Sequence, residues 1–255
     1  MDPLAENGDG RRWPQIVAFV ASAGAAAALL RLAWVRPLLV SALLGGALAF
    51  VLSRWLARRR LRKVLLSGDV HSVLERWSPS LDRIPHPATM GPLMTATAFA
   101  AYGRVDEARA ALAVAERGPA WEAALEHRLF LDAMLLTFEG DRDGALEQAG
   151  RLLRLPLPLA APALQGRVRM LRVAVAALAR AFAHRSQPGD GRILEEASET
   201  SPLVFWAMRY AAAVVAIDQA EWTRARQLLA GAPTWPAEST FRAFHDEILQ
   251  QIPAH

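Results

Sequence analysis

The fold is decided by two similar stretches, Gly103-Arg-Val-Asp-Glu-Ala108-Arg-Ala-Ala-Leu112 and Gly140-Asp-Arg-Asp-Gly-Ala145-Leu-Glu-Gln-Ala149. In each, a glycine opens a turn and an alanine follows five positions later. A third stretch, Ala220-Glu-Trp-Thr-Arg-Ala225-Arg-Gln-Leu-Leu229, repeats the pattern with an alanine in place of the glycine. Such internal similarity predicts an array of helical repeats.

A second alanine lies twelve residues before the first in each stretch. In two antiparallel helices joined by a tight turn, positions twelve apart face each other where the helix axes approach most closely. Only a small residue fits there. The spacing therefore predicts helix–turn–helix packing at three alanine pairs, Ala96 with Ala108, Ala133 with Ala145 and Ala213 with Ala225.

These pairs resemble the signature of the tetratricopeptide repeat family, over roughly residues 60–232. The 37 residues from Ala108 to Ala145 are near the 34-residue period of that family. The 80 residues from Ala145 to Ala225 leave room for a further unit, which we expect as a helix over 164–185, a loop over 187–191 and a helix over 192–197. Residues 68–73 are expected to begin a degenerate second helix of an earlier unit.

The C-terminal segment 240–252 has a helical apolar stripe, which predicts a final helix that covers the end of the last repeat. The predicted fold class is therefore all-α. A tetratricopeptide-like α-solenoid of four to five helix–turn–helix units occupies residues 57–236, and a capping helix lies within 237–255. An unrelated all-α bundle is the alternative.

The N-terminal part contains two uncharged apolar runs, residues 16–30 and 37–52. Counted over 13–32 and 37–56, each is twenty residues long, which is enough to cross a hydrocarbon core of about 30 Å. We therefore expect a disordered tail at 1–12 and a transmembrane helical hairpin at 13–56. Trp13, Trp34 and Trp55 fall near the predicted membrane interfaces. The alternatives are a cleaved signal peptide and a buried pair of core helices.

The charge is distributed unevenly along the chain. Residues 1–63 carry ten basic and three acidic side chains, a net +7, whereas the remainder carries nineteen basic and twenty-two acidic ones, a net −3. Because the domain itself is mildly acidic, no nucleic-acid partner is expected. A basic block follows the second apolar run and predicts cytoplasmic termini and contact with anionic lipid headgroups: Arg58, Arg59, Arg60, Arg62 and Lys63. With one lysine against 28 arginines, the composition suggests a bacterial chain, and hence a multi-pass protein of the inner membrane.

Motifs for catalysis are missing from the sequence. There is no cysteine, no glycine-rich phosphate loop, no dinucleotide fingerprint and no nucleophile elbow, and the six histidines form no H-E-x-x-H pair. The sequence therefore predicts neither an enzyme, nor a metal site, nor a cofactor.

The family resemblance implies that a protein partner binds in a concave groove lined by the first helix of each repeat. Candidate groove residues come from matched first-helix positions and from an arginine stripe that would bind acidic side chains or a terminal carboxylate: Phe99, Tyr102, Asp132, Leu136, Arg169, Arg172 and Arg180. The alternative is a solvated stripe paired with Glu195, Glu196 or Glu199.

The predicted function is that of an adaptor or scaffold, anchored in the inner membrane, that binds a protein partner on the cytoplasmic side. One alternative is a structural subunit of a larger membrane complex, with the hairpin as its interface. Another is an accessory factor of a biosynthetic pathway, because two spans, a basic block and cytosol-facing repeats resemble the plan of HemY-type bacterial membrane proteins.

Overall fold

The computed structural model describes residues 37–252. The chain divides into two compact units, Met1–Arg60 and Leu61–His255. The predicted first span lies outside the described residues, as do Trp13 and Trp34. Residues 37–252 form α-helices and short 3-10 helices with no strand among them, which confirms the all-α class.

Helix α2 (Pro37–Leu66) contains the whole of the predicted second span. Its large apolar side chains at 48–52 are 48–63% exposed. Within the described part of the chain, no single helix is both long and apolar enough to be identified as a membrane span. Among the described helices, only the bent pair Asp190–Thr200 and Pro202–Asp218, with 118° between its members, reaches that length and composition together.

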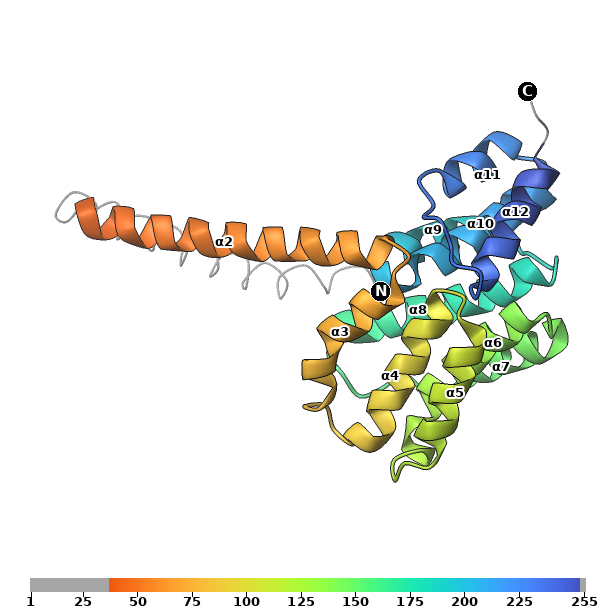
Figure 1. The fold of residues 1–255 in the computed structure, drawn as a ribbon, viewed down its shortest axis with the longest axis horizontal. Helices are drawn as coiled ribbons and strands as arrows, with labels where there is room; N and C mark the ends of the chain where they lie inside the picture. The colour runs from red at the N-terminus through yellow and green to blue at the C-terminus, as the bar shows by residue number, and fades with distance from the viewer. Residues whose placement is uncertain (1–36, 253–255) are drawn as a thin grey trace, which may run out of the picture. The chain divides into compact units, whose positions relative to one another are not determined.

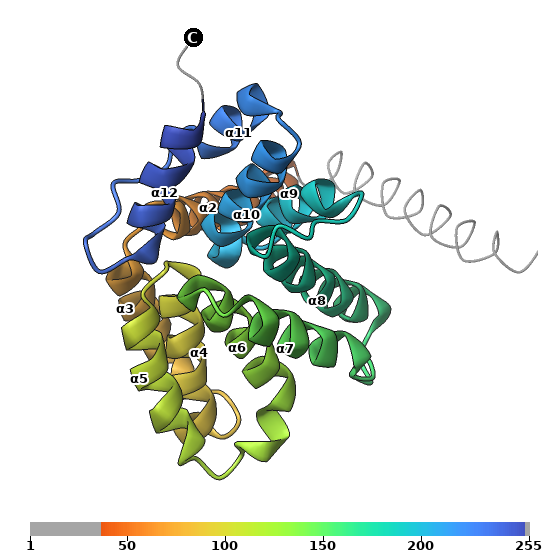
Figure 2. The same cartoon turned by 90° about the vertical axis from the view of Figure 1, so that its right-hand side faces the viewer.

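Unit Leu61–His255 is built from consecutive helix–turn–helix pairs (Figures 1 and 2). After α3 (Val70–Leu81), the pairs are α4 (Pro87–Ala101) with α5 (Val105–Glu116), α6 (Leu125–Glu139) with α7 (Arg142–Arg154), α8 (Pro162–Phe182) with α9 (Asp190–Thr200), and α10 (Phe205–Asp218) with α11 (Trp222–Leu229). The 3-10 helices η1 (Glu122–Ala124) and η2 (Pro202–Val204) lead into α6 and α10, and α12 (Thr240–Gln251) ends the fold.

The repeat-packing alanines all lie in the core and are at most 1% exposed: Ala96, Ala108, Ala133, Ala145, Ala213 and Ala225. Each pair joins two helices that pack against each other. The expected fourth unit is also present as a helix pair, with α8 at Pro162–Phe182 and α9 at Asp190–Thr200.

The turns inside these pairs explain why a small residue opens each repeated stretch. Gly103, Gly140 and Ala220 have φ angles of +69°, +87° and +58°, so each adopts the left-handed conformation that ends a helix. Glycine adopts it without steric cost, whereas Ala220 pays roughly 1 kcal/mol. In the pair formed by α8 and α9, His184 adopts this left-handed conformation in the turn, with φ +53°.

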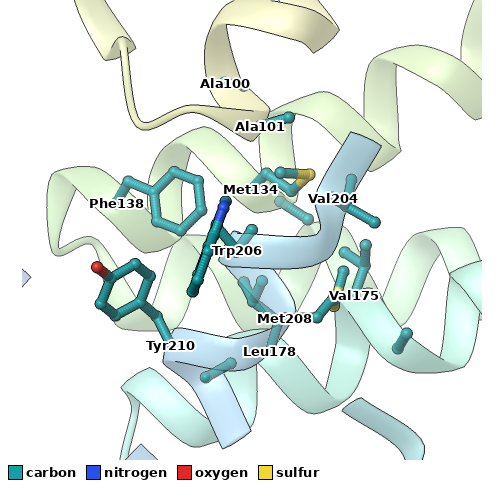
Figure 3. Packing of buried hydrophobic residues seen from close by; sticks show 14 of the residues in the cluster. Ala100, Ala101, Met134, Phe138, Val175, Leu178, Val204, Trp206, Met208 and Tyr210 are labelled. Atoms are coloured by element: carbon teal, nitrogen blue, oxygen red, sulfur yellow. The ribbon is translucent and has the colours of Figure 1, made fainter. Parts of the chain in front are cut away.

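The first helices of the pairs (α4, α6, α8 and α10) close into a ring around the core. Each contacts the next, and α10 also returns to contact α4. In Figure 3 the Trp206 indole lies in the middle of this core, with Met134, Phe138 and Met208 nearby. In a strict solenoid each repeat contacts only its neighbours, so the contact between the first and last pairs departs from that arrangement.

Helix α12 reaches beyond the last pair, which corrects the expectation that it covers only the end of the final repeat. Thr240 N donates to Gly103 O at 2.9 Å, at the turn of the first pair. The buried Phe241 ring lies 5.3 Å from Phe138 of the second pair and 5.1 Å from Tyr210 of the last, between ring centroids. Because residues from three pairs meet Phe241, α12 spans the C-terminal ends of several first helices.

Candidate partner-binding groove

Two adjoining cavities lie toward the N-terminal ends of the first helices. The larger, about 660 Å³, is bounded by α3, the α3–α4 loop, α4 and η1. The smaller, about 280 Å³, lies between α4, α6, α8 and η2. Both are lined by Met94 and His127, so they adjoin, and together they are called here the apolar groove.

The lining of the apolar groove is dominated by large apolar side chains: Trp77, Leu81, Ile84, Met90, Met94, Phe130, Leu171 and Leu203. Methionine is flexible and polarisable, and therefore adapts to apolar partners of different shapes. A depression of this size and composition suits the apolar side chains of a partner segment.

Arg172 and Glu126 form the charged part of the wall, and each nitrogen of the Arg172 guanidinium already donates one hydrogen bond. The Arg172 side chain is 5% exposed, and its Nε donates to Glu126 Oε1 at 2.9 Å. Its Nη1 and Nη2 donate to the carbonyl oxygens of Leu155 and Pro156 at 2.6 and 3.0 Å. Glu126 neutralises the charge of the guanidinium, which already donates to three acceptors. A charged ligand would therefore gain little favourable electrostatic interaction in the groove.

The same contacts hold the loop between α7 and α8, residues 155–161, called here the proline-rich loop (Figure 2). Besides the two bonds from Arg172, Gln165 Nε2 donates to Pro158 O at 3.0 Å. The Leu159 side chain is fully exposed. The loop is thus fixed at its backbone while it presents an apolar side chain to the outside.

Two histidines, His86 and His127, are exposed at the edge of the apolar groove. Neither imidazole ring makes a hydrogen bond within the described part of the chain, although the His86 carbonyl accepts from Thr89 N and Met90 N. No group of three His, Cys, Asp or Glu residues that could hold a metal ion occurs in residues 37–252. The side chains that line the groove are therefore suited to binding apolar groups.

The predicted groove residues on the earlier first helices point elsewhere. Tyr102 is 2% exposed and donates to Leu65 O at 2.8 Å, so it is not available to a partner. Burial raises the pKa of its phenol. Phe99 is half-buried against the His71 ring, at 6.1 Å between centroids, and Leu136 packs against the core.

Asp132 joins α6 to α5 rather than facing a groove. Arg109 Nη1 donates to Asp132 Oδ1 at 3.3 Å and uses its Nε and Nη2 on Glu139, both at 2.7 Å. Burial raises the pKa of Asp132, and the nearby Arg109 opposes the rise. Among the predicted groove residues only Arg172 lines either cavity.

The arginine stripe on α8 does not form one binding surface. Arg169 is exposed, but Arg172 is engaged as described, and Arg180 donates to both carboxylate oxygens of Asp190 at 2.9 and 2.6 Å. Burial tends to raise the pKa of Asp190, yet hydrogen bonds from Arg180 and from Gln187 N bring it below its usual value. The alternative pairing with Glu195, Glu196 or Glu199 is also wrong for Arg172 and Arg180, because Arg172 pairs with Glu126 and Arg180 pairs with Asp190 at the start of α9.

The ends of the first helices that lie away from the apolar groove are covered by α12. Trp235 Nε1 donates to the Tyr210 hydroxyl at 2.6 Å, and that hydroxyl in turn faces His245 Nδ1 at 3.0 Å. Burial raises the pKa of Tyr210, so the phenol stays neutral. A cavity of about 230 Å³ remains between α12 and the rings of Phe138 and Phe182. The chain's own helix therefore occupies this end.

Apart from Trp13 and Trp34, which lie outside the described residues, the predicted membrane-interface residues lie on α2. Trp55 is 52% exposed, and the Arg59 guanidinium carbon lies 5.3 Å from its ring centroid. Arg60, Arg62 and Lys63 are exposed, while the side chain of Arg58 lies outside the described residues.

Sequence reasoning missed the groove itself. Its signal is present in apolar pairs four residues apart near the ends of helices, Trp77 with Leu81 and Met90 with Met94. Such pairs share a helix face, but a face buried by a neighbouring helix and a face left open have the same spacing.

Comparisons of the chain with protein-family models, with curated proteins and with solved structures find no match. The features that bear on function are therefore the apolar groove, the proline-rich loop beside it, and the exposed apolar and basic residues of α2.

Proposed function

We propose that this chain is a tetratricopeptide-like adaptor, anchored in a bacterial inner membrane, that binds a protein partner on the cytoplasmic side. The observation that carries the proposal is the apolar groove, which is open, large and almost uncharged. The anchor consists of residues 13–56 in this proposal, and both termini lie in the cytoplasm.

Support for the anchor comes from the exposure of α2. Its described side chains between residues 45 and 57 are all exposed, and they include Leu48, Phe50 and Val51. A helix that is apolar around its circumference is normally buried in protein or in lipid. The basic residues that follow, Arg59 to Lys63, suit the cytoplasmic headgroup region and its anionic lipids.

Support for partner binding comes from the composition of the groove. If a partner buries a leucine or phenylalanine side chain in the groove, each such side chain contributes about 1.5–3 kcal/mol to the binding free energy. The conformational entropy lost when that side chain becomes ordered reduces this contribution. Because each guanidinium nitrogen of Arg172 already donates to Glu126 or to a loop carbonyl, discrimination would depend mainly on shape and apolarity rather than on charge.

A photo-crosslinking amino acid tests this function in living cells. Placed at Ala123, on the groove lining, it is expected to attach the chain to a protein. Placed at Val114, which is 54% exposed on α5 outside both cavities, it serves as the control. The change Met94→Lys should abolish the crosslink from Ala123, because an ammonium group would be desolvated in the groove. Equal labelling from the two positions would contradict the proposal.

The anchor has a separate test. A reporter enzyme that works only in the periplasm, fused after His255, should be inactive, whereas a cytoplasmic reporter at the same position should be active. An active periplasmic reporter would overturn the proposed orientation.

A further inference from the structure

We propose that the apolar groove of one copy receives the proline-rich loop of a second copy, so that the chain forms a two-fold dimer by reciprocal exchange. The inference rests on the proposed function of the groove and names its occupant. It starts from two complementary surfaces on one domain, an open apolar groove and a fixed apolar loop.

The loop needs a cover that its own domain does not supply. Leu159 is fully exposed, and Leu153 and Leu164 on either side of the loop are 43% and 52% exposed. Residues 155–162 contain no charged side chain. An apolar protrusion of this kind on a protein surface is typical of an interaction site.

The backbone of the loop is already ordered. Arg172 holds the carbonyls of Leu155 and Pro156, and Gln165 holds that of Pro158. Proline further restricts the backbone at three places between 155 and 162. An ordered loop loses little conformational freedom when it docks, which favours association.

The charges around the two surfaces are complementary. Arg151 and Arg154 immediately precede the loop and are exposed. Glu122, at the groove beside Ala123, has a side chain that is 89% exposed and only a long contact of 3.4 Å to Arg128. The uncharged loop therefore matches the apolar lining, and the basic residues before it match the acidic residue at the edge.

The position of Arg172 is compatible with a reciprocal exchange. This side chain lines the groove and also binds the loop, so both surfaces lie beside each other on one side of the domain. When the loop of the first copy enters the groove of the second, a two-fold axis places the loop of the second at the groove of the first. Such an isologous contact closes on itself and produces a dimer rather than a filament.

Crosslinking between chains of different sequence tests the contact directly. The natural chain has no cysteine. Full-length Leu159→Cys and Ala123→Cys chains, carrying different tags, would be co-expressed and treated in membranes with a short bismaleimide. The expected product is a mixed dimer, formed about tenfold more than with the control pair Leu159→Cys and Val114→Cys. No mixed dimer, or equal yields from both pairs, would overturn the inference.

A second measurement does not depend on reagent geometry. In the full chain, Leu159→Asp should raise the dimer dissociation constant by about tenfold or more in analytical ultracentrifugation in mild detergent, because the groove would bury a carboxylate. Val114→Asp, an equally exposed change elsewhere, should leave it unchanged. An unaltered dimer in Leu159→Asp, or a monomeric natural chain, contradicts the exchange.

The outcomes separate this inference from the proposed function. A monomeric chain whose Ala123 photo-crosslink attaches to a different protein would overturn the exchange and leave the adaptor function standing. A monomeric chain whose groove attaches to no protein would overturn both.

Discussion

Replacing Phe241 with alanine measures how strongly α12 is held on the ring of first helices. The Phe241 ring is completely buried and makes edge-on contacts with Phe138 and Trp235, with centroids 5.3 and 5.1 Å apart. Its Cδ1 would lie 2.9 Å from a Cβ at Gly103, so it also packs closely on the turn of the first pair.

The expected loss follows from this burial. Truncation of a buried phenylalanine to alanine costs about 3–5 kcal/mol, and more when the cavity cannot collapse. The rigid rings of Phe138, Tyr210 and Trp235 around the site limit such collapse, so we expect about 4 kcal/mol. The backbone contact of Thr240 with Gly103 O survives the change, and helix α12 should therefore remain docked but weakened.

The assay is urea unfolding of the full chain in mild detergent, followed by circular dichroism and by tryptophan fluorescence. With a slope of about 2–3 kcal/mol per molar urea, the midpoint should fall by about 1.3–2 M. The control is Leu249→Ala on the same helix, where the side chain is 44% exposed and the expected change is within about 0.5 kcal/mol. If Phe241→Ala lost no more stability than Leu249→Ala, the described packing of α12 would be refuted.

Arg172→Met should lower the free energy of unfolding by about 3 kcal/mol, because Glu126 and the loop carbonyls lose a charged donor. A loss under about 1 kcal/mol in the same urea unfolding experiment would contradict this prediction. Asp190→Asn should cost a similar amount at pH 7. The folded pKa of Asp190 lies below its unfolded value of about 3.8, so the carboxylate stabilises the fold at pH values above 3.8. This stabilisation is lost as the pH falls through the folded pKa, so the difference between the two proteins should shrink as the pH is lowered below 3.8. Gly118→Ala should destabilise the fold by about 1–3 kcal/mol, because the added Cβ would lie 2.9 Å from Thr89 Cα. Gly166→Ala, which has open space in α8, should stabilise the fold by about 0.5–1 kcal/mol. Thermal melts in which the Gly118 variant is the more stable of the two would contradict the packing described at both sites.

Local features of this fold were predictable because they depend on neighbouring residues. The twelve-residue alanine spacing predicted helix pairs whose alanines prove to be buried, and the residue that opens each turn has a positive φ. The expected helix at 164–185 corresponds to α8 at Pro162–Phe182. These features follow from the helical period and from turn chemistry, both of which act within a few residues.

The candidate site was less predictable. Tyr102 and Arg172 were placed in a partner groove because their spacing puts them on first-helix faces, yet one binds the end of α2 and the other holds the proline-rich loop. An exposed arginine and a buried, hydrogen-bonded arginine can occupy positions with the same helical spacing. Only the positions of acceptors distant in sequence distinguish them.

The sequence by itself determined the all-α class, the succession of helix pairs and the small residues at their crossings. Only the tertiary structure decided that α10 returns to α4, that α12 lies across several pairs, and that an apolar groove stays open at the other end. The physical reason is the range of the contacts. A helical pattern shows which face is apolar, whereas the partner of that face can be far away in the chain, as Ser239 is from Tyr102, 137 residues apart.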